Sequence, residues 1–330
     1  MGIFFKSTKP LKIVSFGVLA LALAACGDKA EETPKTDDSN TAEVSTEKAG
    51  SETRTLTDAL GNKVEVPGNP QRVIASYLED PLLALGVTPI AQWSVKDGSS
   101  TQRYLQDYLK DVDLINHDLP FEEVQSFEPD LIIMDSASMV EGGKYAQYSA
   151  IAPTYVIGAE LNNDWREELK TVGSIFAMED KAEEVISDYE TKAEEAKAQI
   201  EEKVGQKSAA AIWLVGGSFF VVNQELSSGD VLYNDLGFKV PAVVEEISAN
   251  AENNWNAVSL EKLVELDADY LFLVNSDGSE NTTLSDALWK SIPAVKAGNV
   301  YEFGPETSWL YTGAIANGQI IDNVLESVAK

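Results

Sequence analysis

The residues from 163 to 204 constrain the fold more than any other stretch of the chain. They contain no proline and one glycine, Gly173, and their apolar side chains recur every three or four residues. This spacing predicts long amphipathic helices, with a break near Glu179 and Asp180. Strand and helix patterns alternate on both sides, so we expect two α/β lobes separated by helix. The apolar positions are Leu169, Val172, Ile175, Phe176, Val185, Ile186 and Tyr189.

The alternation outside this stretch predicts where each lobe begins and ends. A Gly61-Asn62 turn between two alternating runs is typical of a hairpin over residues 55–66. Short apolar runs predict buried strands at 73–76, 89–91, 131–134 and 155–157, then at 209–215, 219–222 and 270–274. Such alternation favours a mainly parallel sheet covered by helices. We therefore expect a first lobe over 54–161, a helical linker over 162–204 and a second lobe over 205–330.

The first 53 residues indicate targeting rather than fold. Lys6, Lys9 and Lys12 precede a 13-residue apolar run that ends at Leu23-Ala24-Ala25-Cys26. A run of this length is shorter than the roughly 20 residues that a membrane-spanning helix needs. We expect a lipoprotein signal peptide over 1–25, with Cys26 as the lipidated residue on the extracytoplasmic face of the cell membrane. The polar residues 26–53 are expected to form a flexible tether.

Charge and residue counts exclude several functions. The formal net charge is −29, which opposes binding to nucleic acid. Cys26 and His117 are the only cysteine and histidine, so neither a cysteine zinc site nor a histidine cluster is available. The chain has no Gly-x-Ser-x-Gly elbow, no P-loop and no Gly-x-Gly-x-x-Gly motif. We expect a protein that binds rather than catalyses, and we expect His117 to be an ordinary loop residue.

Six short segments stand in a distinctive order from residue 54 onward. They are Pro70-Gln71-Arg72-Val73, Ala84-Leu85-Gly86-Val87-Thr88-Pro89, Glu128-Pro129-Asp130-Leu131-Ile132-Ile133, Ile151-Ala152-Pro153-Thr154, Val258-Ser259-Leu260-Glu261 and Ile292-Pro293-Ala294-Val295-Lys296-Ala297-Gly298-Asn299-Val300-Tyr301. Their order and spacing resemble the periplasmic-binding-protein family with a helical hinge. Within that family the chain is most similar to the ferric-hydroxamate binders of Gram-positive bacteria.

The resemblance implies a class III fold, in which two Rossmann-like lobes are joined by a long rigid α-helix with a ligand cleft between them. It implies a monomeric substrate-binding component of an ABC importer, which delivers a ferric siderophore to a permease dimer and its ATPase. No cofactor is implied, because iron is bound only through the siderophore. In the family an acid on each lobe meets the permease, and the matching positions are Glu122 and Glu261, with Glu123 as an adjacent competitor.

Aromatic residues near strand ends are the candidate ligand contacts, because ligands of such folds bind where the carboxyl ends of strands meet. Trp213 is equally compatible with the core, whereas Trp165 and Trp289 are assigned to packing. The second lobe has no arginine, which disfavours trianionic ferric catecholates and favours neutral or cationic hydroxamates. Haem, cobalamin and ferric catecholate remain alternatives. The aromatic candidates are Trp93, Trp213, Phe219, Trp255, Trp309 and Tyr311, and Arg103 is a further candidate from the first lobe.

Overall fold

The computed structural model describes residues 52–96, 98–158, 164–249, 251, 253–279 and 281–329. A two-stranded hairpin, β1 (Arg54–Thr57) with β2 (Lys63–Val66), precedes two larger sheets and confirms the predicted hairpin. The Asp58 carboxylate accepts hydrogen bonds from the backbone N–H groups of Leu60 and Asn62, which fixes the turn. Cys26, the predicted signal peptide and most of the predicted tether lie outside the described residues.

The first lobe contains a six-stranded sheet in which every pair except β4–β5 is parallel. Its order is β5-β4-β3-β7-β8, with β6 also paired to β4. The prediction placed a strand at 89–91, but β4 starts only at Ala91 and runs to Val95. Bounds of the strands and helices are β3 (Val73–Ala75), β4 (Ala91–Val95), β5 (Ser100–Thr101), β6 (Asp113–Asn116), β7 (Leu131–Ser136), β8 (Thr154–Gly158), α1 (Glu79–Ala84), α2 (Gln106–Leu109), α3 (Phe121–Ser126) and α4 (Lys144–Ile151).

The second lobe contains a five-stranded sheet of order β11-β10-β9-β12-β13. Strand β10 is antiparallel to both β9 and β11, so the expectation of a mainly parallel sheet is wrong for this lobe. The physical reason is the two-residue Gly216-Gly217 turn, which reverses the chain with positive φ at both glycines. Bounds are β9 (Ala209–Val215), β10 (Ser218–Val222), β11 (Trp255–Val258), β12 (Tyr270–Asn275), β13 (Val300–Phe303), α7 (Ser228–Asp230), α8 (Ala242–Ser248), α9 (Leu260–Leu263), α10 (Pro293–Ala297) and α11 (Ala314–Val328).

The two lobes repeat one device at the start of a buried strand. Asp130 precedes β7, and its carboxylate accepts the backbone N–H groups of Gln71 and Arg72 at 2.7 and 2.9 Å. Asp269 precedes β12 in the same way and accepts the N–H of Ser208 at 2.9 Å. In each lobe a carboxylate therefore ties the start of one strand to the segment that enters the neighbouring strand.

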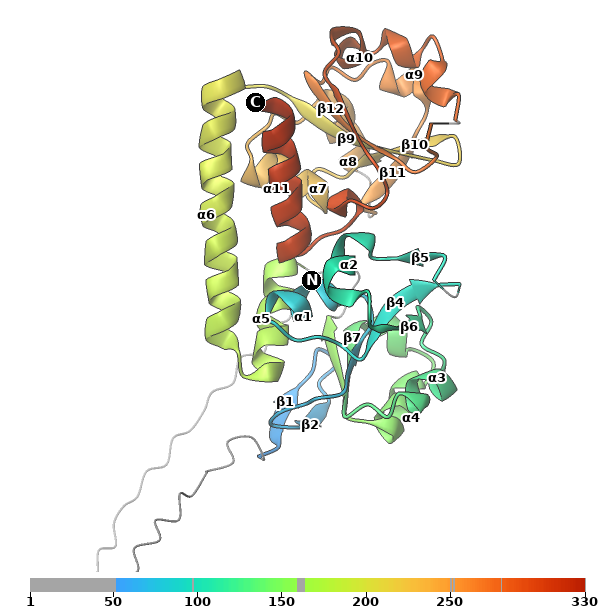
Figure 1. The fold of residues 1–330 in the computed structure, drawn as a ribbon, viewed down its shortest axis with the longest axis vertical. Helices are drawn as coiled ribbons and strands as arrows, with labels where there is room; N and C mark the ends of the chain where they lie inside the picture. Colours follow the sequence, from blue (N-terminus) through green and yellow to red (C-terminus); the bar gives the residue numbers. More distant parts are fainter. Residues whose placement is uncertain are drawn as a thin grey trace, which may run out of the picture. The chain divides into compact units, whose positions relative to one another are not determined.

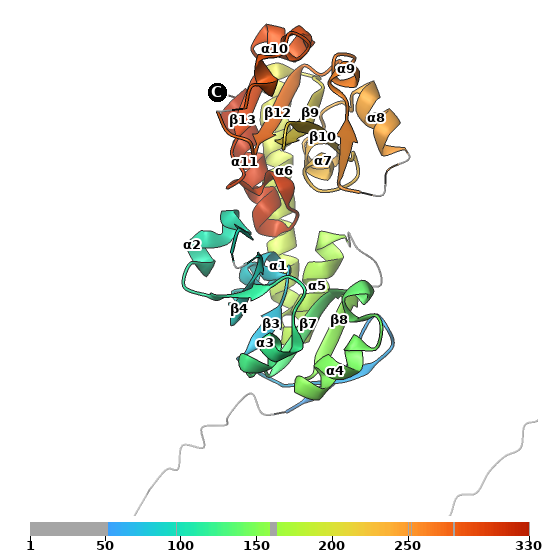
Figure 2. The same cartoon turned by 90° about the vertical axis from the view of Figure 1, so that its right-hand side faces the viewer.

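Two helices connect the lobes and confirm the predicted helical stretch. Helix α5 (Trp165–Phe176) and helix α6 (Glu179–Val204) are separated by the left-handed residue Ala177. Figures 1 and 2 show α6 running past both lobes with α11 alongside it. One core cluster extends from Val73 and Leu131 of the first lobe through Ile186 to Phe272 and Ile320.

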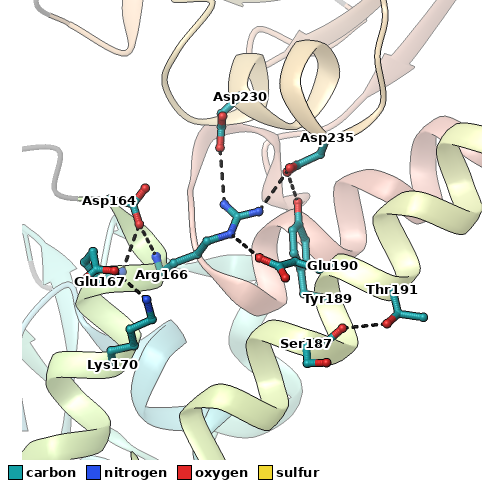
Figure 3. A network of polar contacts seen from close by, with 10 residues as sticks. All are labelled: Asp164, Arg166, Glu167, Lys170, Ser187, Tyr189, Glu190, Thr191, Asp230 and Asp235. Atoms are coloured by element: carbon teal, nitrogen blue, oxygen red, sulfur yellow. Dashed lines mark hydrogen bonds and ion pairs between the residues drawn. The ribbon is translucent and has the colours of Figure 1, made fainter.

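A polar network joins α5 to the second lobe (Figure 3). The Arg166 guanidinium lies 3.2 Å from Asp235, 3.4 Å from Glu190 and 3.9 Å from Asp230. Tyr189 of α6 donates a hydrogen bond to the other oxygen of Asp235. The Arg166 side chain is 22% exposed, so water screens this network only in part.

A second connection runs from Asp80 of α1 to the start of α11. Oδ1 of Asp80 accepts the N–H of Ile315 at 3.1 Å, and Oδ2 accepts the N–H of Ala316 at 2.9 Å. Gly313, at the N-cap of α11, has no side chain that could accept these hydrogen bonds. A residue of the first lobe therefore caps a helix that follows the second sheet in sequence, which ties the lobes together at a second point.

Candidate functional site

A cavity of about 610 Å³ is lined by residues from both lobes. The first lobe contributes the ends of β3, β4 and β7, and the second contributes Trp213 of β9, the start of β11 and the segment 310–312. This volume lies within the usual range for small-molecule sites. The lining residues are Ser76, Tyr77, Pro81, Trp93, Ser100, Gln102, His117, Asp135, Met139, Glu168, Trp213, Asn254, Trp255, Leu310, Tyr311 and Thr312.

Aromatic rings line both sides of this cavity. On the first lobe Tyr77 contacts Trp93 edge to face, with ring centroids 5.2 Å apart. On the second lobe Trp213 contacts Trp255 in the same manner at 6.1 Å, and Nε1 of Trp213 donates to Ser276 Oγ at 2.8 Å. Edge-to-face pairs hold each ring in place while leaving part of its face open. The cavity therefore offers preorganised apolar walls.

Tyr311 bridges the two walls. Its ring lies 6.4 Å from Tyr77 and 4.8 Å from Tyr104, and its hydroxyl donates to the carbonyl of Thr101 at 3.4 Å. Burial raises the pKa of Tyr311, while the charge of Arg103 acts to lower it. The phenol is thus neutral at physiological pH and serves as an apolar wall with a polar tip.

Glu79 supports the cavity wall from beneath. Its side chain is fully buried, and Oε1 accepts the backbone N–H of Trp93 at 2.6 Å. Burial raises the pKa of Glu79 from its ordinary 4.5 to about 7, and the hydrogen bond from Trp93 opposes that rise. The contact fixes the backbone of Trp93 against α1.

Four of the predicted ligand contacts lie in this lining: Trp93, Trp213, Trp255 and Tyr311. Their contact with a ligand stays a prediction. Trp255 is the first residue of the edge strand β11 rather than a loop residue, and the sequence did not indicate that strand. Arg103 is exposed and is not a lining residue.

Two predicted contacts belong to the core instead. Trp309 is fully buried, stacks on Phe272 at 4.9 Å and donates from Nε1 to Asn323 at 3.2 Å. Phe219 is 4% exposed and stacks on Trp289 at 5.2 Å. The assignment of Trp309 and Phe219 to the cleft is therefore wrong, because each ring is covered by another ring of its own lobe. The assignment of Trp165 and Trp289 to packing is confirmed, since both are buried.

Several lining residues were not predicted. His117 follows β6 and reaches the cavity, and Glu168 reaches it from the first turn of α5. Tyr77 follows β3 with a positive φ of 67°. Each stands at a strand end or helix start facing the sheet edge, but nothing in the sequence pattern distinguishes it from an exposed polar residue.

The predicted docking acids, Glu122 and Glu261, are exposed and stand in the first turns of α3 and α9. The competitor Glu123 is less exposed, and its Oε1 accepts the N–H of Asn116 at 3.4 Å. Helices α3 and α9 lie on the same side of the view in Figure 1, one in each lobe. A role of these acids in docking stays a prediction.

Two lobes of α/β structure joined by long helices around a shared cavity define a class III solute-binding protein. Residues 75–307 match the family described as "Periplasmic binding protein", and the chain belongs to this family.

Relatives and solved structures agree with this assignment. The Bacillus subtilis protein named Iron(3+)-hydroxamate-binding protein FhuD is 28% identical over 329 residues, which covers 98% of each chain. The B. subtilis protein named "Probable siderophore-binding lipoprotein YfiY" is 28% identical over 324 residues and 94% of each chain. A crystal structure of a FhuD fold-family component of a Fep/Fec-like ferrichrome ABC transporter from B. subtilis has a TM-score of 0.70 at 25% identity, and covers 83% of this chain and 100% of that one.

Proposed function

We propose that this protein is the substrate-binding component of an ABC importer and that it captures a ferric siderophore of the hydroxamate type. The observation that carries the proposal is the cavity between the lobes, with aromatic rings on both sides and no lysine or arginine in the lining that the structure describes. A hydroxamate chelate has an apolar body and no net negative charge, which suits such walls. Two relatives support the same class by their names, one as an iron(3+)-hydroxamate-binding protein and the other as a probable siderophore-binding lipoprotein.

Binding without catalysis is part of this proposal. Within the described ranges no group of three or more His, Cys, Asp or Glu residues is placed to hold a metal ion. We expect iron to enter already chelated, with no ligand to the metal from the protein and no cofactor. The aromatic lining supports this expectation, since it fits the organic surface of a chelate rather than a bare ion.

The proposal extends to location and partners. No helix in the described part of the chain is long and apolar enough to cross a membrane. We propose that a lipid on Cys26, palmitate included, holds a monomer on the extracytoplasmic face of the cell membrane. Glu122 and Glu261 would then meet a permease dimer that is driven by its ATPase. Replacing Cys26 with Ala should release the protein from membranes without changing its affinity for ligand, and continued palmitate labelling of that variant would contradict the anchor.

The siderophore class is tested by titrating the protein with a panel of ligands. Native mass spectrometry and quenching of tryptophan fluorescence are measured with ferrioxamine B, ferrichrome, a ferric catecholate, haem and cobalamin. We expect tight binding of at least one hydroxamate. Tight binding of haem, cobalamin or the catecholate, with none of either hydroxamate, would overturn the hydroxamate assignment and leave the family intact.

A further inference from the structure

The charged side chains that line the cavity are acidic. Asp135, near the end of β7, and Glu168, in the first turn of α5, face it from two elements of the first lobe. The described lining residues include no lysine or arginine. Arg103 lies close enough to Tyr311 to influence the pKa of that phenol but outside the lining. The cavity therefore offers two carboxyl groups to a ligand that carries a cation.

Glu168 lies in a field of like charge. Burial, with Asp135 of β7, Asp80 of α1 and Asp164 at the N-cap of α5, raises its pKa well above the usual range. No described residue donates a hydrogen bond to its carboxylate or pairs with it. The guanidinium of Arg166, two residues earlier, is engaged by Asp235, Asp230 and Glu190. A cation brought by the ligand would relieve this repulsion.

Two lining residues also carry a buried oxygen without a hydrogen-bond donor among the described residues. Gln102 is 4% exposed and lines the cavity, yet its Oε1 has no donor among the described residues. Oδ1 of Asn254, on the opposite lobe, is buried and likewise lacks a donor from the described chain. A buried acceptor without a donor costs roughly 1–3 kcal/mol. Both oxygens are closed to solvent, so a ligand could donate to them only after a side chain moves.

We propose that Glu168, assisted by Asp135, recognises a primary ammonium group on the ferric hydroxamate, so that the site selects cationic complexes over neutral ones. This inference rests on the proposed function. An ammonium group supplies three N–H donors and one positive charge. Because the raised pKa of Glu168 favours its protonated form, entry of that charge would draw the proton from its carboxyl, and binding would release a proton.

The test compares two ligands that differ only in this group: ferrioxamine B, which carries one free ammonium, and its N-acetylated derivative, which is neutral. Affinities are measured by tryptophan quenching on the full-length protein and on Glu168→Gln. The matched control is Glu167→Gln, because Glu167 is exposed and pairs with Lys170 on the same helix. We expect the wild-type protein to bind ferrioxamine B about tenfold more tightly than the acetylated ligand. Glu168→Gln should remove this preference, whereas Glu167→Gln should keep it.

A second measurement uses the wild-type protein alone. Calorimetry in phosphate and in Tris should give different binding enthalpies for ferrioxamine B, because the released proton is taken up by the buffer, and equal enthalpies for the acetylated ligand. Equal wild-type affinities for the two ligands, or buffer-independent enthalpies for both, would overturn this inference while leaving siderophore binding in place. If neither ligand binds while ferrichrome does, this inference fails and the proposed function stands. Binding of no hydroxamate at all would overturn the proposed function.

Discussion

Gly313 leaves room for the carboxylate of Asp80 at the start of α11: a β-carbon at position 313 would lie 2.4 Å from Cγ and from Oδ1 of Asp80. The φ angle of Gly313 is 140°, which also favours glycine. Asp80 is 2% exposed, and besides the two helix N–H groups it accepts a hydrogen bond from the hydroxyl of Tyr104 at 3.0 Å. Two residues 233 positions apart therefore form one cap, with the glycine supplying the space and the aspartate the acceptor.

Removal of this cap should weaken the protein measurably. Asp80→Ala leaves the N–H groups of Ile315 and Ala316 without an acceptor, so we expect a loss of about 2 kcal/mol in the free energy of unfolding in urea. Amide hydrogen exchange at those two residues should accelerate. Asp107→Ala is the control, because Asp107 is exposed at the start of a different helix. A change no larger than that of the control would show that the cap does not contribute to stability.

Glu79 should give the stability a pH dependence of known sign. Its pKa in the folded protein, about 7, exceeds the ordinary 4.5, so the folded state binds the extra proton and its stability falls as pH rises through this window. Asp80, raised to about 6, acts in the same direction. Glu79→Gln keeps an oxygen for the Trp93 N–H and cannot ionise. Between pH 5 and pH 8 we expect the free energy of unfolding of the variant to rise relative to that of wild type, by up to roughly 3 kcal/mol.

Urea unfolding at several pH values, followed by tryptophan fluorescence, measures this effect. Glu65→Gln, at an exposed position of β2, is the matched control. Parallel pH profiles for wild type and Glu79→Gln would rule out the titration of Glu79 as the cause.

The wall tryptophans and the core tryptophan should respond differently to substitution. Trp255→Ala removes a cavity wall, and we expect it to weaken ferric hydroxamate binding more than tenfold, which corresponds to about 1.4 kcal/mol. Trp309→Phe should lower stability and leave the affinity of the folded protein unchanged, because Trp309 is covered by Phe272 and Phe303. Fluorescence titration measures the ligand affinity of each variant. Equal losses of affinity in Trp309→Phe and Trp255→Ala would contradict the assignment of Trp309 to the core and Trp255 to the cavity wall.

Charge reversal of the docking acids should separate delivery from capture. Glu122→Lys with Glu261→Lys should abolish most siderophore uptake by cells and leave affinity in solution unchanged, since both side chains are exposed and outside the cavity lining. Glu183→Lys with Glu202→Lys makes the same change of charge on exposed positions of α6. Normal uptake by the first double variant would exclude Glu122 and Glu261 from docking.

The two connections between the lobes should also limit closure. A long helix and a shared core resist bending more than strand hinges do, so the radius of gyration from X-ray scattering should be nearly equal with and without ligand. Arg166→Met loosens the network with Asp230 and Asp235 and should increase the difference. A contraction of wild type as large as that of a hinge-bending receptor would be inconsistent with this rigidity.

The sequence predicted those features that depend on local periodicity. The hairpin, most of the buried strands and the break between α5 and α6 follow from alternation, apolar runs and helical spacing, all of which act within a few residues. Trp93, Trp213, Trp255 and Tyr311 were expected at the cleft because they stand near strand ends, and all four line the cavity.

Features that depend on distant partners could not be predicted. Trp309 occupies the same kind of sequence context as Tyr311, and only the stacking of Phe272 from β12 decides that it is buried. Glu168 resembles any acid in the first turn of a helix until β7 brings Asp135 beside it. The antiparallel β10 follows from the local Gly216-Gly217 turn, whereas the edge position of β11 depends on its pairing with the distant β10.

The first lobe needs α11 to complete its fold, and this limits the order in which the protein can fold. Helix α11 follows every other described element, yet its Ala316 packs with Tyr104, Leu105 and Leu109 of the first lobe, and its first amides satisfy Asp80. A nascent chain that has produced the first sheet still lacks this cover, and its buried carboxylate has no helix to cap. Folding can therefore begin at the first lobe but cannot finish there, and chains truncated before Ala314 should be more sensitive to proteases than the full chain.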